Sequence, residues 1–188
     1  TGHDTPPRLD PALTEAEMQE GRELIQPAGS APVLLHPGAP GDPRSWPTDA
    51  YRQLACELLD RGVEVFVLTG PSEVSVGLQL QESLPRAKHL VGQRGLRTLA
   101  SALAAATHCG GCLVAGDSGP AHVSASVGLP VVLIAGPEDP AHTGPWPVAP
   151  AAVHRIAGPP WRVRAITEVS VEDALKAVLS VITPPRGR

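Results

Sequence analysis

Short apolar runs alternate with longer amphipathic runs along most of this 188-residue chain. Each apolar run is short enough to be a buried strand, and the runs between them have helical spacing. Because strands that alternate with helices are typical of parallel sheets, the pattern predicts an α/β fold with a Rossmann-like parallel sheet and helices on both faces. The expected strands are Val33 to His36, Val63 to Thr69, His89 to Val91, Cys112 to Ala115, Leu129 to Ala135 and Val153 to Ile156.

Capping residues and glycine mark the ends of the expected helices. Thr14 and Glu17 form a capping-box pattern, and Ser170 with Asp173 opens the last helix in the same way. Gly62 stands where a C-terminal stop belongs. The expected helices are Thr14 to Gln26, Thr48 to Arg61, Val74 to Ser83, Leu96 to Thr107, Ala121 to Val127 and Ser170 to Ile182.

The loops that follow the expected strands hold nearly every unusual glycine, proline, histidine, tryptophan and acidic residue. In open parallel sheets, ligands bind beyond the carboxyl ends of the strands, so these loops predict a ligand site. No G-x-G-x-x-G follows the first strand and no G-x-x-x-x-G-K-[ST] occurs, so neither a dinucleotide-dependent oxidoreductase nor a P-loop enzyme is supported. The loops are His36 to Pro47, Thr69 to Glu73, Gly92 to Gly95, Gly116 to Pro120 and Gly136 to Trp146.

The stretch Val114 to Pro130 combines a strand end, a tight polar turn, a helix of small residues and the start of another strand. A helix N-terminus carries unpaired amides and the positive end of the helix dipole, and glycine lets an anion approach it closely. Asp117 and Ser118 are both expected capping residues. Two interpretations of Asp117 stay open, a cap alone or a ligand contact, and His122 lies one turn into the helix.

Composition excludes several classes of protein. The net charge of -4 argues against a nucleic-acid groove or a polybasic membrane surface. Three cysteines do not form a secreted disulfide framework, and no apolar run is long enough to span a bilayer. We therefore expect a cytoplasmic protein. The chain begins at Thr1 and its only methionine is Met18, which favours an excised or processed piece.

Several motifs together resemble glycosyltransferase family 9, the ADP-heptose:lipopolysaccharide heptosyltransferases. The most specific is D-S-G-P-x-H at Asp117 to His122, which is followed by G-L-P and later by G-P. H-P-G at His36 to Gly38, W-P at Trp46 and the T-G-P-S-E loop at Thr69 to Glu73 agree with it. The resemblance extends in the same order from Val33 to Ile182.

The resemblance implies a two-domain GT-B enzyme of which this chain is the C-terminal half. Residues 1–32 would be the interdomain linker with a leading helix, and residues 33–188 the domain that binds the nucleotide-sugar donor. The N-terminal half, with the acceptor site and the carboxylate base, would be absent. The implied reaction is inverting transfer of heptose from ADP-heptose to a lipopolysaccharide-core or related glycan acceptor, without catalysis by this chain alone. Membrane association at the inner face of the inner membrane would come from the absent half.

The family resemblance also assigns roles to residues of the loops. Ser118 and Gly119 would donate hydrogen bonds to the diphosphate, while Asp117 and His122 would contact the sugar or the phosphates of the donor. Glu73 would accept hydrogen bonds from ribose hydroxyls, or would simply be an acid favoured at a helix start.

Arg44 is the expected catalytic cation, which would stabilise the leaving diphosphate. The family usually has Lys-Arg before Trp-Pro, whereas this chain has Arg44-Ser45, and an exposed loop cation is the alternative role. His36, Gly38 and Thr69 complete the expected donor-binding set. The sequence has no D-x-D, so we expect no metal and no cofactor.

Two other functions stay open from the sequence. In the first, the domain is a nucleotide-binding module of glycan assembly that has lost catalysis. In the second, it is a redox protein that uses a C-x-x-C motif. Cys109 and Cys112 form the C-x-x-C, but the motif closes a helix and enters a strand, the reverse of the usual redox arrangement. A zinc site would lack a second pair of ligands, so buried, inert thiols are expected.

Overall fold

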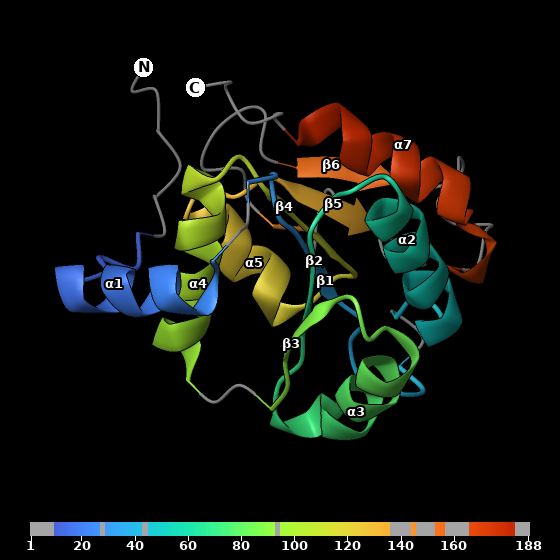
Figure 1. Ribbon diagram of the computed structural model, residues 1–188, viewed down its shortest axis with the longest axis horizontal. Helices are drawn as coiled ribbons and strands as arrows, with labels where there is room; N and C mark the ends of the chain where they lie inside the picture. Colours follow the sequence, from blue (N-terminus) through green and yellow to red (C-terminus); the bar gives the residue numbers. More distant parts are fainter. Residues whose placement is uncertain are drawn as a thin grey trace, which may run out of the picture.

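The chain folds around a parallel β-sheet with helices on both faces (Figure 1). A computed structural model describes residues 10–26, 29–42, 45–92, 95–135, 144–145, 153–156 and 166–182. In these ranges the strands are β1 (Val33–His36), β2 (Val65–Leu68), β3 (Lys88–Leu90), β4 (Cys112–Ala115), β5 (Val131–Ile134) and β6 (Val153–Ile156). The α-helices are α1 (Glu15–Leu24), α2 (Thr48–Asp60), α3 (Val74–Ser83), α4 (Leu96–His108), α5 (Gly119–Ser126) and α7 (Val171–Val181).

The expected elements are all present, and their boundaries differ for local reasons. Strand β2 begins at Val65 because the amide of Val63 still donates to the carbonyl of Leu58, which closes α2. Strand β5 begins at Val131 because the amide of Leu129 donates to Ser124 in α5. The predicted α/β class is confirmed.

The described strands form a six-stranded sheet in the order β3-β2-β1-β4-β5-β6, and every neighbouring pair is parallel. The order reverses between β1 and β4, which pair from Val33 with Cys112 to His36 with Ala115. In sheets of this kind the connections on the two sides of the reversal diverge and leave a crevice at the carboxyl ends. The topology therefore places the ligand site next to the loops after β1 and β4.

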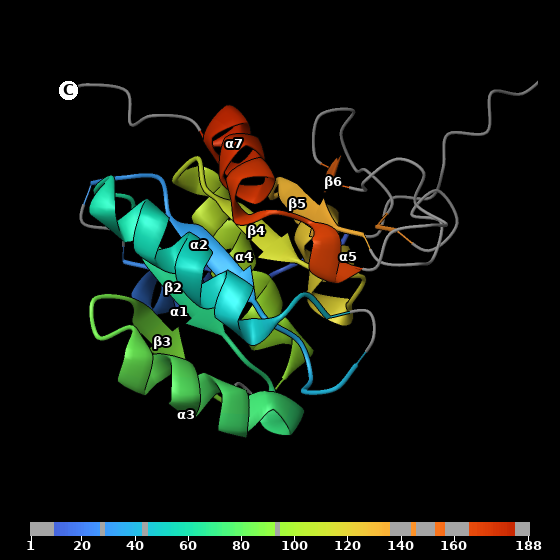
Figure 2. The ribbon, with the colours of Figure 1, turned by 90° about the vertical axis from the view of Figure 1, so that its right-hand side faces the viewer.

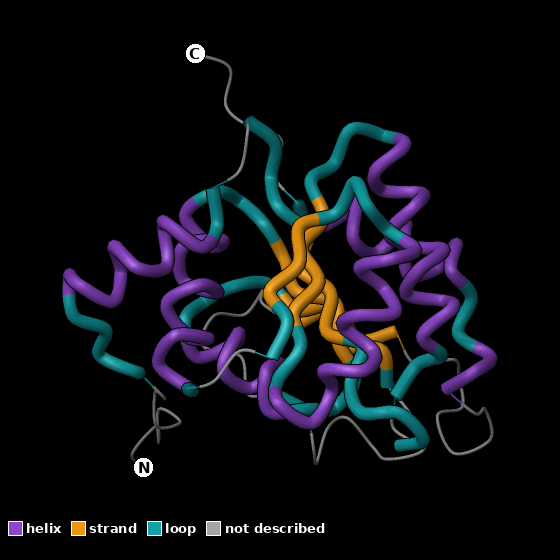
Figure 3. The backbone as a smooth tube through the Cα atoms, turned by 60° about the horizontal axis from the view of Figure 1, so that its bottom comes forward, coloured by secondary structure: helices purple, strands orange, loops and turns teal. Residues whose placement is uncertain are grey.

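Alternate residues of the strands belong to two separate apolar cores. Val33 and Leu35 of β1 pack with α2, α3 and α7, whereas Leu34 packs with α4 and α5. Figure 2 looks onto the first of these faces, with α2, α3 and α7 in front of the sheet. Figure 3 shows the strands enclosed between the two helical layers. All four residues of β1 and of β4 are buried, as expected for central parallel strands.

Helix α1 has the predicted capping box. The Thr14 hydroxyl accepts from the Glu17 amide at 3.3 Å, and the Glu17 carboxylate accepts from the Thr14 amide at 2.8 Å. The helix crosses α4 at very close range. Gly21 is buried in this crossing, and a Cβ at that position would overlap the carbonyl oxygen of Ser101.

We predict that Gly21→Ala lowers the free energy of unfolding by about 1–2 kcal/mol, because the cost of overpacking exceeds the gain in helix propensity. Chemical denaturation measures the change. Gly119→Ala is the matched control, since a Cβ at this exposed helical glycine would meet no described atom within 4 Å. Equal stability of the two variants would contradict the close crossing.

Candidate functional site

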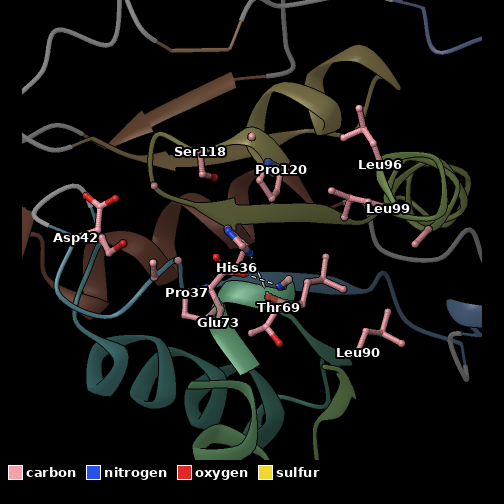
Figure 4. Close-up of a pocket in the computed structure, with 18 of the residues that line it drawn as sticks. His36, Pro37, Asp42, Thr69, Glu73, Leu90, Leu96, Leu99, Ser118 and Pro120 are labelled. Atoms are coloured by element: carbon pink, nitrogen blue, oxygen red, sulfur yellow. Dashed lines mark hydrogen bonds between the residues drawn. The ribbon is translucent and has the colours of Figure 1, made fainter. Parts of the chain in front are cut away.

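A cavity of about 520 Å³ lies at the carboxyl edge of the sheet, next to the reversal of strand order (Figure 4). It is lined by the ends of the central strands, the turns that follow them and the first turns of α4 and α5. The lining residues are Leu24, His36, Pro37, Gly38, Ala39, Asp42, Ser45, Leu68, Thr69, Gly70, Glu73, Leu90, Gly95, Leu96, Thr98, Leu99, Ala102, Gly116, Asp117, Ser118, Gly119 and Pro120.

The lining divides into a polar and an apolar part. In Figure 4, Leu90, Leu96 and Leu99 lie on one side of the site, and Asp42 lies on the opposite side with His36 between them. The polar part follows β1, β2 and β4, whereas the apolar part comes mainly from β3 and α4. A cavity of this kind fits an elongated ligand with one apolar end and one strongly polar end.

The turn after β4 presents a buried hydroxyl at the cavity wall. Ser118 is the N-cap residue of α5, yet its side chain makes no capping hydrogen bond within the described part of the chain. Ser118 thus occupies the expected capping position, but the side-chain hydrogen bond expected of a cap is not found among the described residues. The backbone carbonyl of Ser118 accepts from Ala121 instead, at 3.0 Å. The Ser118 Oγ atom is buried and, among the described residues, has no hydrogen-bond partner.

Asp117 pairs with His122 across the first turn of α5. The distance from His122 Nε2 to Asp117 Oδ1 is 3.6 Å, and the side chain of His122 is half-exposed. Asp117 lines the cavity, whereas His122 is not among the lining residues. The structure thus brings both predicted residues together, and only Asp117 of the two lies at the cavity wall.

His36 sits buried at the end of β1, in the middle of the site. Its Nδ1 lies 3.2 Å from the carbonyl oxygen of Leu68. Since a carbonyl only accepts, Nδ1 carries the proton, and Nε2 of the neutral ring is then an acceptor. Burial lowers the pKa of His36, against smaller opposing effects of the Leu68 hydrogen bond and the charge of Glu73.

Thr69 follows β2 and is held between two glycines. Its Oγ1 accepts from the Gly92 amide at 3.4 Å, and the residue is almost fully buried. A Cβ at Gly77 would lie 2.6 Å from Thr69 Oγ1 and would press on Val91. Only glycine at position 77 therefore lets α3 approach the end of β2 so closely.

Glu73 lines the cavity and is also tied into its own turn. Its Oε2 accepts from the Gly70 amide at 2.7 Å, and its Oε1 accepts from the Ser72 hydroxyl. The turn Pro71–Glu73 is a short 3₁₀ helix that runs into α3. Both interpretations made from the sequence therefore have structural counterparts, a cavity acid and a helix-start acid.

The loop after β1 folds back on itself and is anchored by a tryptophan. Gly38 has φ +74° and a Cβ there would overlap the Ser45 hydroxyl, so glycine is required on both grounds. Trp46 is buried, and its Nε1 donates to the Val169 carbonyl at 2.9 Å. Its ring meets that of Tyr51 edge to face, with centroids 5.1 Å apart. Packing of this loop is thus the clear role of Trp46.

Some predicted positions lie outside the described residues. They are Arg44, the expected catalytic cation, and residues 136–143 and 146 of the expected loop Gly136 to Trp146. Of the remaining candidates, His36, Gly38, Thr69, Glu73, Asp117, Ser118 and Gly119 all line the cavity.

The apolar part of the cavity was largely missed from the sequence. Leu24 and Leu99 are ordinary residues of amphipathic helices, and only tertiary contacts bring them to the same wall as Leu96. Asp42 could have been identified from the sequence as a site residue, because it is an acidic residue in the glycine- and proline-rich loop after β1. Within the described ranges, no group of three or more histidine, cysteine, aspartate or glutamate side chains could hold a metal ion.

The C-x-x-C thiols have raised rather than lowered pKa values. Burial raises the pKa of Cys112 to about 12, and burial followed by the charge of Glu64 raises the pKa of Cys109. A redox-active cysteine needs a stabilised thiolate, so these environments argue against the redox alternative.

We predict that lowering the pH through 6.5, the ordinary pKa of histidine, reduces stability through His36. The folded state disfavours the charged ring, so below this pH the unfolded chain binds more protons and the free energy of unfolding falls. The measurement is an NMR titration, with the signal assigned through His36→Asn, and denaturation of both proteins above and below pH 6.5. A His36 midpoint above 6.5, or an equal stability loss in the variant, would contradict the prediction.

We also predict that Cys109 and Cys112 react slowly with an alkylating reagent in the folded protein at mildly alkaline pH, because little thiolate is present. The same reagent should label both thiols quickly after unfolding, which controls for reagent quality. Rapid labelling of Cys109 in the folded state would restore the redox alternative.

Comparison with known proteins places the chain among the heptosyltransferases. Over 171 residues it is 29% identical to lipooligosaccharide heptosyltransferase 2 of Haemophilus influenzae, covering 84% of this chain and 48% of that protein. The structure is similar to Escherichia coli ADP-heptose lipopolysaccharide heptosyltransferase II, with a TM-score of 0.74, 22% identity and coverage of 90% and 52%. Escherichia coli heptosyltransferase WaaC with ADP gives a TM-score of 0.68, 23% identity and coverage of 89% and 48%.

The chain spans about half the length of the curated relatives it matches. None of the helices in the described ranges has the length and apolar content needed to cross a membrane. The family model of glycosyltransferase family 9 (heptosyltransferase) matches residues 3–160. The chain therefore belongs to glycosyltransferase family 9, the heptosyltransferase family.

Proposed function

We propose that this chain is the donor-binding half of an inverting heptosyltransferase and that its cavity binds ADP-heptose. The observation that carries the proposal is the buried hydroxyl of Ser118 at the N-terminus of α5, beside the reversal of strand order, which has no hydrogen-bond partner among the described residues. An unsatisfied buried hydroxyl costs about 1–3 kcal/mol, which a phosphate oxygen would offset by accepting a hydrogen bond from it. The dipole of α5 favours the same anionic ligand.

The two parts of the cavity suit the two ends of a nucleotide sugar. The diphosphate lies at Ser118 and Gly119 in this proposal, with Arg44 supplying positive charge to the leaving group. The base lies against Leu96 and Leu99 on the apolar wall, and the ribose faces Glu73. The solved WaaC structure was obtained with ADP, which supports this choice of nucleotide.

The proposal assigns the acceptor and the general base to a second domain. The curated relatives are about twice as long as the part that this chain matches, and the relative from Haemophilus influenzae is a lipooligosaccharide heptosyltransferase. The acceptor is then a lipopolysaccharide-core or related glycan, which attacks the anomeric carbon as ADP leaves. His36, with a bare Nε2, serves as a hydrogen-bond acceptor for the bound donor and not as a cation.

We predict that the chain binds ADP more tightly than UDP or GDP in calorimetric titrations and transfers no sugar alone. Ser118→Ala should weaken ADP binding about tenfold, since a hydrogen bond to a charged group contributes about 1.5–3 kcal/mol. Its control is Ser126→Ala at the other end of α5, where the hydroxyl donates to the Val123 carbonyl at 2.7 Å.

The same titrations test the cation. Arg44→Ala should also weaken ADP binding, whereas Arg52→Ala, which breaks an exposed pair with Asp49 at 2.8 Å, should leave it unchanged. Absence of nucleotide binding, or equal affinity of Ser118→Ala and Ser126→Ala, would contradict the donor site. Sugar transfer by the isolated chain would contradict its assignment as a half-enzyme.

A further inference from the structure

Helix α1 reaches the cavity, although the family resemblance placed it with the linker before the domain. Leu24 at its C-terminal end lines the apolar wall, and Ile25, the next residue, is buried in the core shared by α4 and α5. Figure 1 shows α1 lying beside α4. The crossing at Gly21 leaves no room for a side chain between the two helices.

Polar contacts tie α1 to the turn of α4 that faces the ligand cavity. Arg97 binds both carboxylate oxygens of Glu17 and also the carbonyl oxygens of Pro11 and Ala12, at 3.2 and 3.3 Å. The next residue, Thr98, donates to Glu20 at 3.1 Å. Hydrogen bonds from Arg97, and smaller contributions from Thr14, lower the pKa of Glu17 to about 2, so the Glu17–Arg97 pair is charged at neutral pH.

The residues on either side of Arg97 are cavity residues. Leu96, Thr98 and Leu99 all line the cavity, so any movement of the first turn of α4 changes its apolar wall. The N-cap residue of α4, Gly95, offers no side-chain cap within the described structure. The side chains of Arg97 and Thr98 instead fix this turn by their hydrogen bonds to the α1 segment.

The segment before α1 is held in an unfavourable conformation by the same arginine. Ala12 has φ 45°, a left-handed conformation that non-glycine residues adopt at an energetic cost. Its amide donates to Asp10 at 2.9 Å and its carbonyl accepts from Arg97. Beyond α1, Lys88 donates to the Gln26 carbonyl at 2.6 Å, so the helix is anchored at both ends.

We propose that α1 forms part of the ligand-contacting wall of the donor cavity. Glu17 and Arg97 are positioning residues that couple the packing of α1 against α4 to ligand binding. A ligand that contacts Leu24 and Leu96 stabilises the packing of α1 against α4. By thermodynamic reciprocity, α1 packed in this way strengthens ligand binding. This inference rests on the proposed function only in using a nucleotide as the ligand.

The test combines calorimetry with amide hydrogen exchange on the full chain. ADP at saturation should slow exchange in α1 of the wild type. Glu17→Gln keeps the side-chain shape needed for the capping box but loses the charge, and it should weaken ADP binding about fivefold and abolish the protection. Glu15→Gln is the matched control, because Glu15 pairs at 2.5 Å with Arg22 on the same helix; it should bind ADP like the wild type.

A second variant covers the case in which Glu17→Gln unfolds. Leu24→Ala removes the side chain at the cavity but leaves the polar contacts of Arg97 and Thr98 with the α1 segment in place. It too should weaken ADP binding, while the thermal midpoint stays close to that of Glu15→Gln. A stability loss with unchanged ADP affinity in both variants would show a purely structural role. ADP binding without protection of α1 overturns the coupling alone, whereas the absence of ADP binding by the wild type overturns the proposed function and the coupling together.

Discussion

The parallel pairing of β1 with β4 is the contact on which the rest of the molecule depends. It joins Val33 to Cys112 and His36 to Ala115 at the point where the strand order reverses. The chain leaves β1 toward α2 on one face and leaves β4 toward α5 on the other. Because the two connections separate, the carboxyl ends of the strands stay uncovered and form the floor of the cavity.

Two buried polar side chains of the site lower the stability of the folded chain. Ser118 keeps a buried hydroxyl without a described partner, and His36 stays a neutral ring in a buried position. Unpaired or desolvated groups of this kind cost free energy that a packed apolar residue would not. Both residues line the cavity, which is the physical reason to assign them to a ligand. The large cores on both faces of the sheet supply the stability that offsets their cost.

Much of the fold and the polar part of the site could be predicted from the sequence. Loops after parallel strands meet at one edge, so Gly38, Thr69, Glu73 and Ser118 could be assigned to one cavity before any contact was known. The lack of a capping hydrogen bond from Ser118 could not be predicted, because Asp and Ser are both common at capping positions. Only the geometry of the turn decides which side chain, if either, forms the bond. The apolar wall escaped prediction because leucines of amphipathic helices are equally typical of a core.

The sequence by itself determined the class of fold, the order of its elements, the capping box of α1 and the family. These follow from local patterns and contiguous motifs, in which the interacting residues lie within a few positions of one another. Only the tertiary structure decided that Leu24 of α1 lines the cavity, that Arg97 binds Glu17, and that Gly21 is needed where α1 crosses α4. Such contacts join segments far apart in the chain, and their partners are selected by the packing of whole helices rather than by any local preference.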